Sequence, residues 1–128
     1  MAGRASAFAR QVPSLECVHV ELLFWEGCPS HPTALADLRN AMADLGLDPT
    51  TVEVREVTTE AQAHQERFVG SPTIRVDGAD VSPPGDEPPA LNCRLYRRRD
   101  GRVSPTPDPA DLRDALKAAL LPAGAEGR

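Results

Sequence analysis

The feature that most restricts the fold of this chain is an apolar run, Val18 to Trp25, followed at once by Gly27-Cys28-Pro29. The run is almost continuously apolar, which is typical of a central β-strand buried on both faces. After Pro29, apolar side chains recur at helical spacing, and proline is tolerated in the first turn of a helix. The segment therefore predicts a strand that passes directly into a helix, with Cys28 at the junction.

The position of Cys28 suggests thiol chemistry. Unpaired backbone N–H groups and the positive end of the helix dipole favour an anion at a helix N-terminus. As the N-cap residue, Cys28 would turn its sulfur toward the N–H groups of Ser30 and His31. A thiol in such a place loses its proton more easily, and the thiolate is the reactive form. The alternative is an inert buried cysteine, because free cysteine also packs as a small apolar residue.

His31 is the second candidate residue of the site. It follows Cys28 by three positions, so the two would share one helix face. As an imidazolium it would lower the pKa of the thiol, and as a neutral ring it would accept a proton or bind a metal. The alternative is an exposed histidine at a helix start that has no role in the site.

Size and composition exclude several classes of protein. The 128 residues correspond to one domain, and a net charge of −5 argues against nucleic-acid binding. No apolar stretch approaches the roughly 20 residues that a membrane span needs. Met1 to Ser14 lacks the apolar core of a secretory signal, so we expect a cytoplasmic protein with reduced thiols. None of the three cysteines forms a Cys-x-x-Cys motif, so no structural disulfide framework is expected.

Hydrophobic periodicity and turn residues predict the order β-α-β-α-β-β-α. A strand–helix–strand unit implies a parallel pair, and the last two strands are expected to pair antiparallel. The result is a four-stranded mixed sheet with helices on both faces. We expect a domain over 15–121, between disordered tails at 1–14 and 122–128. The predicted strands are 18–25, 52–57, a third at Ile74 and Val76, and 91–98; the predicted helices are 29–46, 60–68 and one capped by Asp108; the proline-containing segment 79–90 is predicted to be a loop.

Cys93 alternates in phase with Leu91 and Leu95, which predicts that it faces the core. Counting along a simple hairpin places it about 13–17 Å from Pro72. This is too far for a disulfide with Cys28, which requires Cα atoms within about 7 Å. A proline loop that folds back would cancel this argument. The pair Cys17 and His19 lies roughly 30 Å away along the first strand and offers only two metal ligands.

This order of elements, with Cys28 after the first strand and Ser71-Pro72-Thr73 before the third, resembles the thioredoxin-like superfamily over about residues 16–121. The resemblance implies that Cys28 is the nucleophile and that His31 stands where a resolving cysteine is common. It also implies that Pro72 is the cis-proline beside the active cysteine. Such a proline would leave the backbone of the preceding residue free to pair with an extended substrate.

A fainter resemblance connects the chain to the alkylmercury (organomercurial) lyases. Their catalytic core is related to this fold and uses a cysteine, an aspartate three residues later and a second cysteine some sixty residues later. Cys28 and Cys93 are similarly spaced here, whereas His31 stands in place of the aspartate. The N-terminal helical domain of those lyases has no counterpart in this sequence.

Three functions follow as alternatives. The first is a monothiol oxidoreductase in which Cys28 attacks a disulfide or small electrophile and an external thiol regenerates it. The second is a site for organomercurials or soft metals, for which Cys28, His31 and Cys93 would supply the ligands. The third is a binding module that has kept the fold and lost catalysis. No cofactor, nucleic acid or membrane partner is expected.

Overall fold

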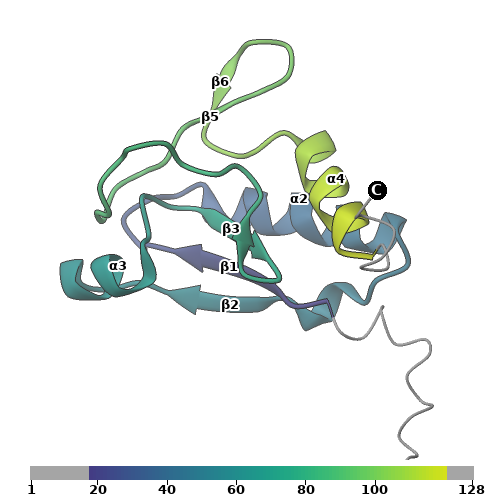
Figure 1. Ribbon diagram of the computed structural model, residues 1–128, viewed down its shortest axis with the longest axis horizontal. Coiled ribbons are helices and arrows are strands. Elements are labelled where there is room, and N and C mark those ends of the chain that lie inside the picture. Colours follow the sequence, from purple (N-terminus) through teal and green to yellow (C-terminus); the bar gives the residue numbers. More distant parts are fainter. Residues whose placement is uncertain (1–17, 121–128) are drawn as a thin grey trace, which may run out of the picture.

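The computed structural model describes residues 18–120 and shows an α/β fold (Figure 1). A mixed sheet forms its middle layer, and a small separate hairpin projects from the side that carries α2 and α4. In chain order the elements are β1 (Val20–Phe24), α2 (His31–Asp44), the 3₁₀ turn η2 (Pro49–Thr51), β2 (Glu53–Glu56), α3 (Glu60–Glu66), β3 (Thr73–Val76), β4 (Ala79–Asp80), β5 (Tyr96–Arg97), β6 (Val103–Ser104) and α4 (Pro109–Leu120).

The sheet has four strands in the order β2-β1-β3-β4. β1 pairs parallel with β2, with Leu22 opposite Val54, and antiparallel with β3, with Leu22 opposite Ile74. β4 pairs antiparallel with β3 at the sheet edge. The parallel pair requires a crossover, which α2 provides. The expectation of a four-stranded mixed sheet flanked by helices is therefore confirmed in its general form.

The two faces of the sheet carry separate apolar clusters. α2 and α4 pack together on one face, where the larger cluster contains Val20, Leu22, Leu38, Met42, Ile74, Val76, Leu112 and Leu116. α3 covers only one end of the other face, where Leu23, Val57, Ala63 and Phe68 form the smaller cluster. Successive residues of β1 point to opposite faces, so Leu22 and Leu23 serve different clusters. This explains the almost continuous apolar character of the strand.

The ends of the helices follow local rules. α2 ends at Asp44, and Gly46 has φ +81°, a conformation that glycine adopts without a steric penalty. The N–H of Leu47 then donates to the C=O of Met42, which closes the helix end. The N–H of Gln62 donates to the Thr59 hydroxyl at the start of α3. The N–H of Ala110 donates to the Asp108 carboxylate, which confirms the predicted cap at Asp108.

Two predictions about the elements are wrong. The fourth strand of the sheet is Ala79–Asp80, within the segment predicted to be a loop, and not 91–98. Asp77-Gly78, with φ values of +52° and +85°, forms the tight turn into it. An Asp-Gly pair is a strong hairpin signal, and the sequence prediction overlooked it. α2 begins at His31 instead of Pro29, because its first backbone bond runs from the Ala34 N–H to the Ser30 C=O.

The segment predicted as the fourth strand belongs to a different structure. Within 91–98 only Tyr96–Arg97 is a strand, and it pairs with β6 in the projecting hairpin. Between β4 and β5 the chain runs to the end of the molecule where α3 lies and then returns (Figure 1).

Within residues 18–120 no helix combines the length and apolar character needed to cross a membrane. The predicted tails, 1–14 and 122–128, lie outside the described residues.

Candidate functional site at Cys28 and Cys93

Cys28 lies in the short connection between β1 and α2. Its N–H donates to the C=O of Trp25 at 3.0 Å, which forms a turn directly after the strand. The residue is only 1% exposed. Its sulfur lies 3.2 Å from the Ser30 hydroxyl oxygen, and its thiol donates to the C=O of Ser71 at 3.5 Å. The connection therefore buries the sulfur against the residue that precedes Pro72.

Cys93 lies beside Cys28, which corrects two predictions. It is exposed and does not face the core, and it forms an isolated parallel bridge with Ser71. The hairpin count failed because β3 pairs with β4 and not with 91–98. The proline-containing chain after β4 instead returns over the end of the sheet and brings Cys93 to the Cys28 thiol. The fold thus joins two cysteines that are 65 positions apart in the sequence.

The two thiols have opposite pKa shifts. Burial by itself raises the pKa of Cys28, but hydrogen bonds from Cys93, from the side chain and N–H of Ser30 and from Ser71 outweigh it and lower the pKa overall. The pKa of Cys93 is raised, first by its hydrogen bond to Cys28 and then by burial and the negative charge of the Cys28 thiolate. These directions make Cys28 the thiol that ionises first and Cys93 the thiol that keeps its proton.

The side chains of Ser30 and Ser71 belong to the site, and the sequence analysis predicted no role for either hydroxyl. Ser71 is fully buried, and among the described residues its hydroxyl oxygen has no hydrogen-bond partner at ordinary distance. The hydroxyl is free to turn toward the sulfur, where it helps to lower the pKa of Cys28. The positions were detectable, because Ser30 follows Cys28 by two residues and Ser71 precedes Pro72.

His31 has a different environment from the one predicted. Its ring stacks on Phe24, with ring centroids 4.1 Å apart and planes 17° apart. Its Nδ1 lies 3.4 Å from the backbone carbonyl oxygen of Cys28 and is not directed at the sulfur. Hydrogen bonds from Ser30, Ser71 and Cys93 lower the thiol pKa, and His31 does not contribute. In this arrangement His31 supports the backbone of the connection.

Pro72 follows a cis peptide bond, as the resemblance implies. Its carbonyl accepts a hydrogen bond from the hydroxyl of Tyr96, whose pKa is raised by burial, so the hydroxyl keeps its proton. The expectation of a free backbone before Pro72 is wrong. The Ser71 N–H donates to the C=O of Asn92, and the Ser71 C=O accepts from the N–H of Arg94, both at 2.8 Å. The chain's own segment 92–94 occupies this edge.

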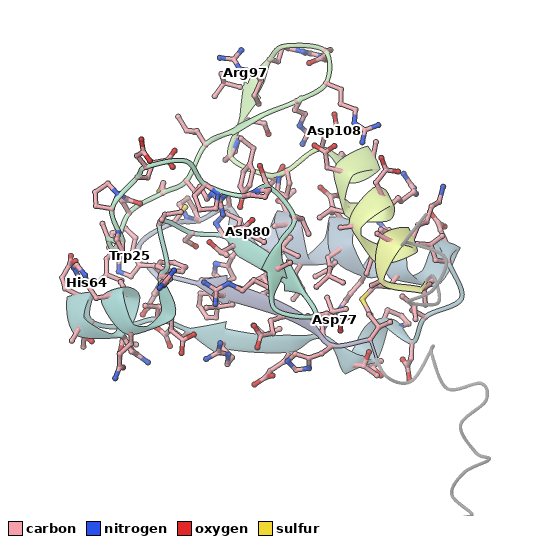
Figure 2. The ribbon with its side chains drawn as sticks, viewed as in Figure 1. Trp25, His64, Asp77, Asp80, Arg97 and Asp108 are labelled. Atoms are coloured by element: carbon pink, nitrogen blue, oxygen red, sulfur yellow. The ribbon has the colours of Figure 1, made fainter. Side chains whose placement is uncertain are left out.

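Arg94 fixes the segment that carries Cys93. Its side chain is 9% exposed, and its guanidinium group forms a 2.8 Å ion pair with Asp80, which lies on β4 near the centre of the molecule (Figure 2). It also donates to the Thr73 hydroxyl at 3.3 Å and to the Ser82 carbonyl. The group stacks over the ring of Tyr96, 4.6 Å from its centroid. These contacts tie the returning chain to β3 and β4 and so hold Cys93 in place.

Trp25 supplies an optical probe near the site. It is the only tryptophan of the chain and lies at the same end of the molecule as His64 of α3 (Figure 2). A Cβ atom added at Gly27 would come within 2.5–2.8 Å of three atoms of the Trp25 ring. The glycine therefore allows the indole to pack against the backbone immediately before Cys28.

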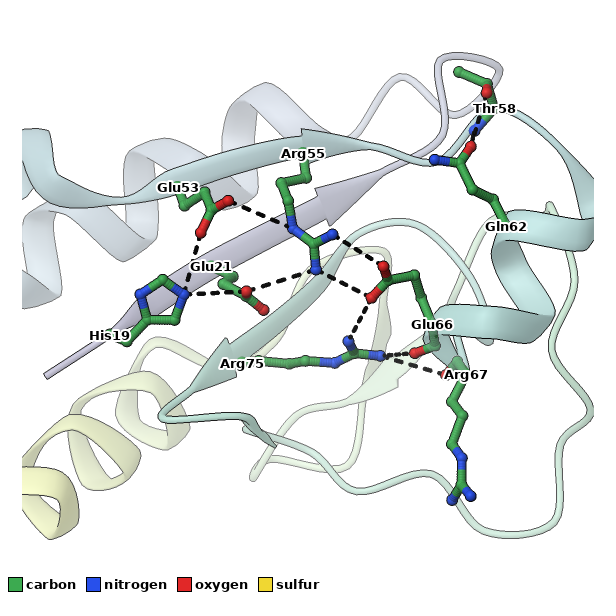
Figure 3. A network of polar contacts seen from close by, with 9 residues as sticks. All are labelled: His19, Glu21, Glu53, Arg55, Thr58, Gln62, Glu66, Arg67 and Arg75. Carbon is green, nitrogen blue, oxygen red and sulfur yellow. Dashed lines mark hydrogen bonds and ion pairs between the residues drawn. The ribbon is translucent and has the colours of Figure 1, made fainter.

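A network of charges covers the rest of the sheet face that α3 leaves open (Figure 3). Arg55 lies between Glu21 at 3.5 Å and Glu66 at 3.0 Å. His19 Nε2 lies 3.1 Å from Glu21 and 3.2 Å from Glu53, a grouping that could hold a cation. Arg55 already offsets the charge of these carboxylates. Cys17, which the sequence analysis paired with His19, lies outside the described residues.

Comparison with known proteins adds no relative. No protein-family model matches the chain, and no curated protein or solved structure matches it at a significant level. The function must therefore be argued from the chemistry of the Cys28 and Cys93 pair.

Proposed function

We propose that this protein is a dithiol oxidoreductase of thioredoxin-like type, in which Cys28 is the nucleophile and Cys93 is the resolving thiol. One observation carries the proposal: the Cys28 thiol contacts Ser71 and Cys93 is bridged to the same residue, so the fold brings both cysteines to one place. The thiolate is the attacking species in thiol–disulfide exchange. A thiol that stays protonated beside it is suited to the second step. Cys93 thus takes the role of the resolving cysteine that the sequence lacks at His31.

The arrangement around the pair supports this assignment. The sheet order β2-β1-β3-β4, the helix after the cysteine and Pro72 beside the thiol are consistent with the thioredoxin-like resemblance. The sulfur of Cys28 lies 3.2 Å from the Ser30 hydroxyl, and a hydrogen bond donated by that hydroxyl stabilises a thiolate. An external thiol would return the disulfide to the reduced form.

The test is the rate of Cys28 alkylation against pH in Cys17→Ser and Cys17→Ser/Cys93→Ser variants. The proposal expects a Cys28 midpoint below the ordinary value of about 8.5 in the first variant and a higher midpoint in the second. On oxidation with a small disulfide, the first variant should form the Cys28–Cys93 disulfide, and the second should stop at a mixed disulfide, as mass spectrometry would show. An ordinary midpoint in both variants would refute the proposal.

The same pair of thiols favours a second candidate, the binding of a soft metal or an organomercurial. Thiolates are the preferred ligands of such ions, and Cys28 and Cys93 provide two at one place. The ring of His31 is stacked on Phe24, so it offers no acid at the sulfur to protonate a leaving carbon. Titration with phenylmercuric acetate separates the candidates: tight binding that needs both cysteines, without disulfide formation on oxidation, would favour this function. A protein active in neither assay would be a binding module.

A further inference from the structure

The backbone at Ser71 is already paired with another segment of the same chain. Both backbone hydrogen-bonding groups of Ser71 are used, the N–H by Asn92 and the C=O by the N–H of Arg94. Cys93 lies between these two residues and is bridged to Ser71. An extended peptide approaching Cys28 along this edge would need the same two groups, because strand addition depends on unpaired backbone N–H and C=O.

Segment 92–94 is packed tightly against the backbone beneath it. A Cβ atom added at Gly70 would lie 2.7 Å from the Asn92 side-chain oxygen and 2.8 Å from the Arg94 Cβ, and φ there is +153°. Glycine is therefore required for this close approach. The ion pair of Arg94 with Asp80, both largely buried, secures the segment from the other side. Displacing it would expose a charged pair and break backbone hydrogen bonds.

Cys93 is open to small molecules. Cys93 lines an open cavity of about 430 Å³ beneath the proline-containing chain, together with Pro83, Pro84, Pro88, Arg94 and Tyr96. Cavities of roughly 300–1,000 Å³ are typical of small-molecule sites. Cys28 is 1% exposed and does not line this cavity, so Cys93 is the thiol of the pair that the cavity exposes.

We infer that the thiol pair acts on low-molecular-weight disulfides that enter through the Cys93 cavity, and that segment 92–94 excludes polypeptide disulfides. This inference rests on the proposed dithiol function. The Cys28 thiolate attacks one sulfur of the small disulfide and expels the first thiolate, which takes a proton from solvent. Cys93 then releases its proton to solvent, attacks the Cys28 sulfur and expels the second thiolate, which also takes a proton from solvent. One small disulfide is reduced to two thiols, and the protein dithiol is oxidised to the Cys28–Cys93 disulfide.

The experiment compares two oxidants of the reduced Cys17→Ser protein, bis(2-hydroxyethyl) disulfide and insulin. Acid quenching and mass spectrometry measure the rate at which the Cys28–Cys93 disulfide forms. Insulin is expected to react at least about tenfold more slowly, because an open minor conformation is populated at roughly 10% or less. Asp80→Ala should raise the insulin rate relative to the small-disulfide rate, whereas Asp44→Ala, which removes an exposed ion pair with Arg113, should not.

Two results would overturn the inference. The first is that insulin and the small disulfide oxidise the Cys17→Ser protein at equal rates. The second is an unchanged ratio of the two rates in both Asp80→Ala and Tyr96→Phe; the latter variant removes a single hydroxyl that bonds to the Pro72 carbonyl. Failure of the proposed function looks different, because neither oxidant would then form the Cys28–Cys93 disulfide.

Discussion

The ion pair between Asp80 and Arg94 offers the sharpest test of how Cys93 is held. The carboxylate and the guanidinium group are 2.8 Å apart, and their side chains are 12% and 9% exposed. Asp80→Ala leaves a cation largely buried without its counter-ion. Removing one partner of a buried pair costs about 3–5 kcal/mol. Arg94 keeps its bonds to Thr73 and Ser82, so we expect a value near the lower end, about 3 kcal/mol.

A matched control isolates the effect of burial. Asp44 pairs with Arg113 between α2 and α4 at 2.7 Å, but these side chains are 55% and 41% exposed. The geometry is similar, whereas solvent screening limits an exposed pair to about 0.2–1 kcal/mol. Asp44→Ala should therefore lower the free energy of unfolding by less than about 1 kcal/mol. The difference between the two variants measures the burial of the Asp80 pair.

Urea unfolding, followed by Trp25 fluorescence and circular dichroism, gives the free energy of unfolding of each variant. Equal slopes with urea concentration are needed for the comparison, since the slope reports the surface exposed on unfolding. Asp80→Ala should also slow the alkylation of Cys28 near neutral pH, because a displaced Cys93 no longer lowers the pKa of that thiol. Equal destabilisation by the two substitutions, with unchanged alkylation, would refute the view that this pair positions Cys93.

Two further predictions concern the face of the sheet that α3 partly covers. Phe68→Ala should lower the free energy of unfolding by about 3–5 kcal/mol, because the ring is fully buried, whereas Val54→Ala on the exposed edge strand should stay within about 0.5 kcal/mol in the same urea assay. Glu66→Gln should cost about 1 kcal/mol at pH 7, because the hydrogen bond from Arg55 lowers the pKa of Glu66. A lowered pKa contributes stability above the unfolded value of about 4.3 and loses it as the pH falls further, so wild type and variant should converge in urea titrations in acid. A difference that does not decrease as the pH falls below about 4.3 would contradict this assignment.

Local features of the sequence predicted much of the fold. The apolar run of Val18 to Trp25 identified the central strand, because a strand between two apolar clusters has no polar face. The spacing of Leu38 and Met42, and Gly46 after them, identified the buried face and the end of α2. Cys28 could be identified from the sequence as well, because the passage from a strand into a helix depends on residues that are neighbours in the chain.

The second thiol depended on contacts that no local pattern encodes. Cys93 reaches Cys28 because β4 forms through the Asp77-Gly78 turn and sends the chain back over the sheet end, where Arg94 pairs with Asp80. The position of His31 likewise depends on stacking against Phe24, which spacing along a helix does not reveal. The sequence alone determined a strand, a helix and a cysteine between them. Only the tertiary structure decided which residue that cysteine meets, because pairing and burial between distant segments set that choice.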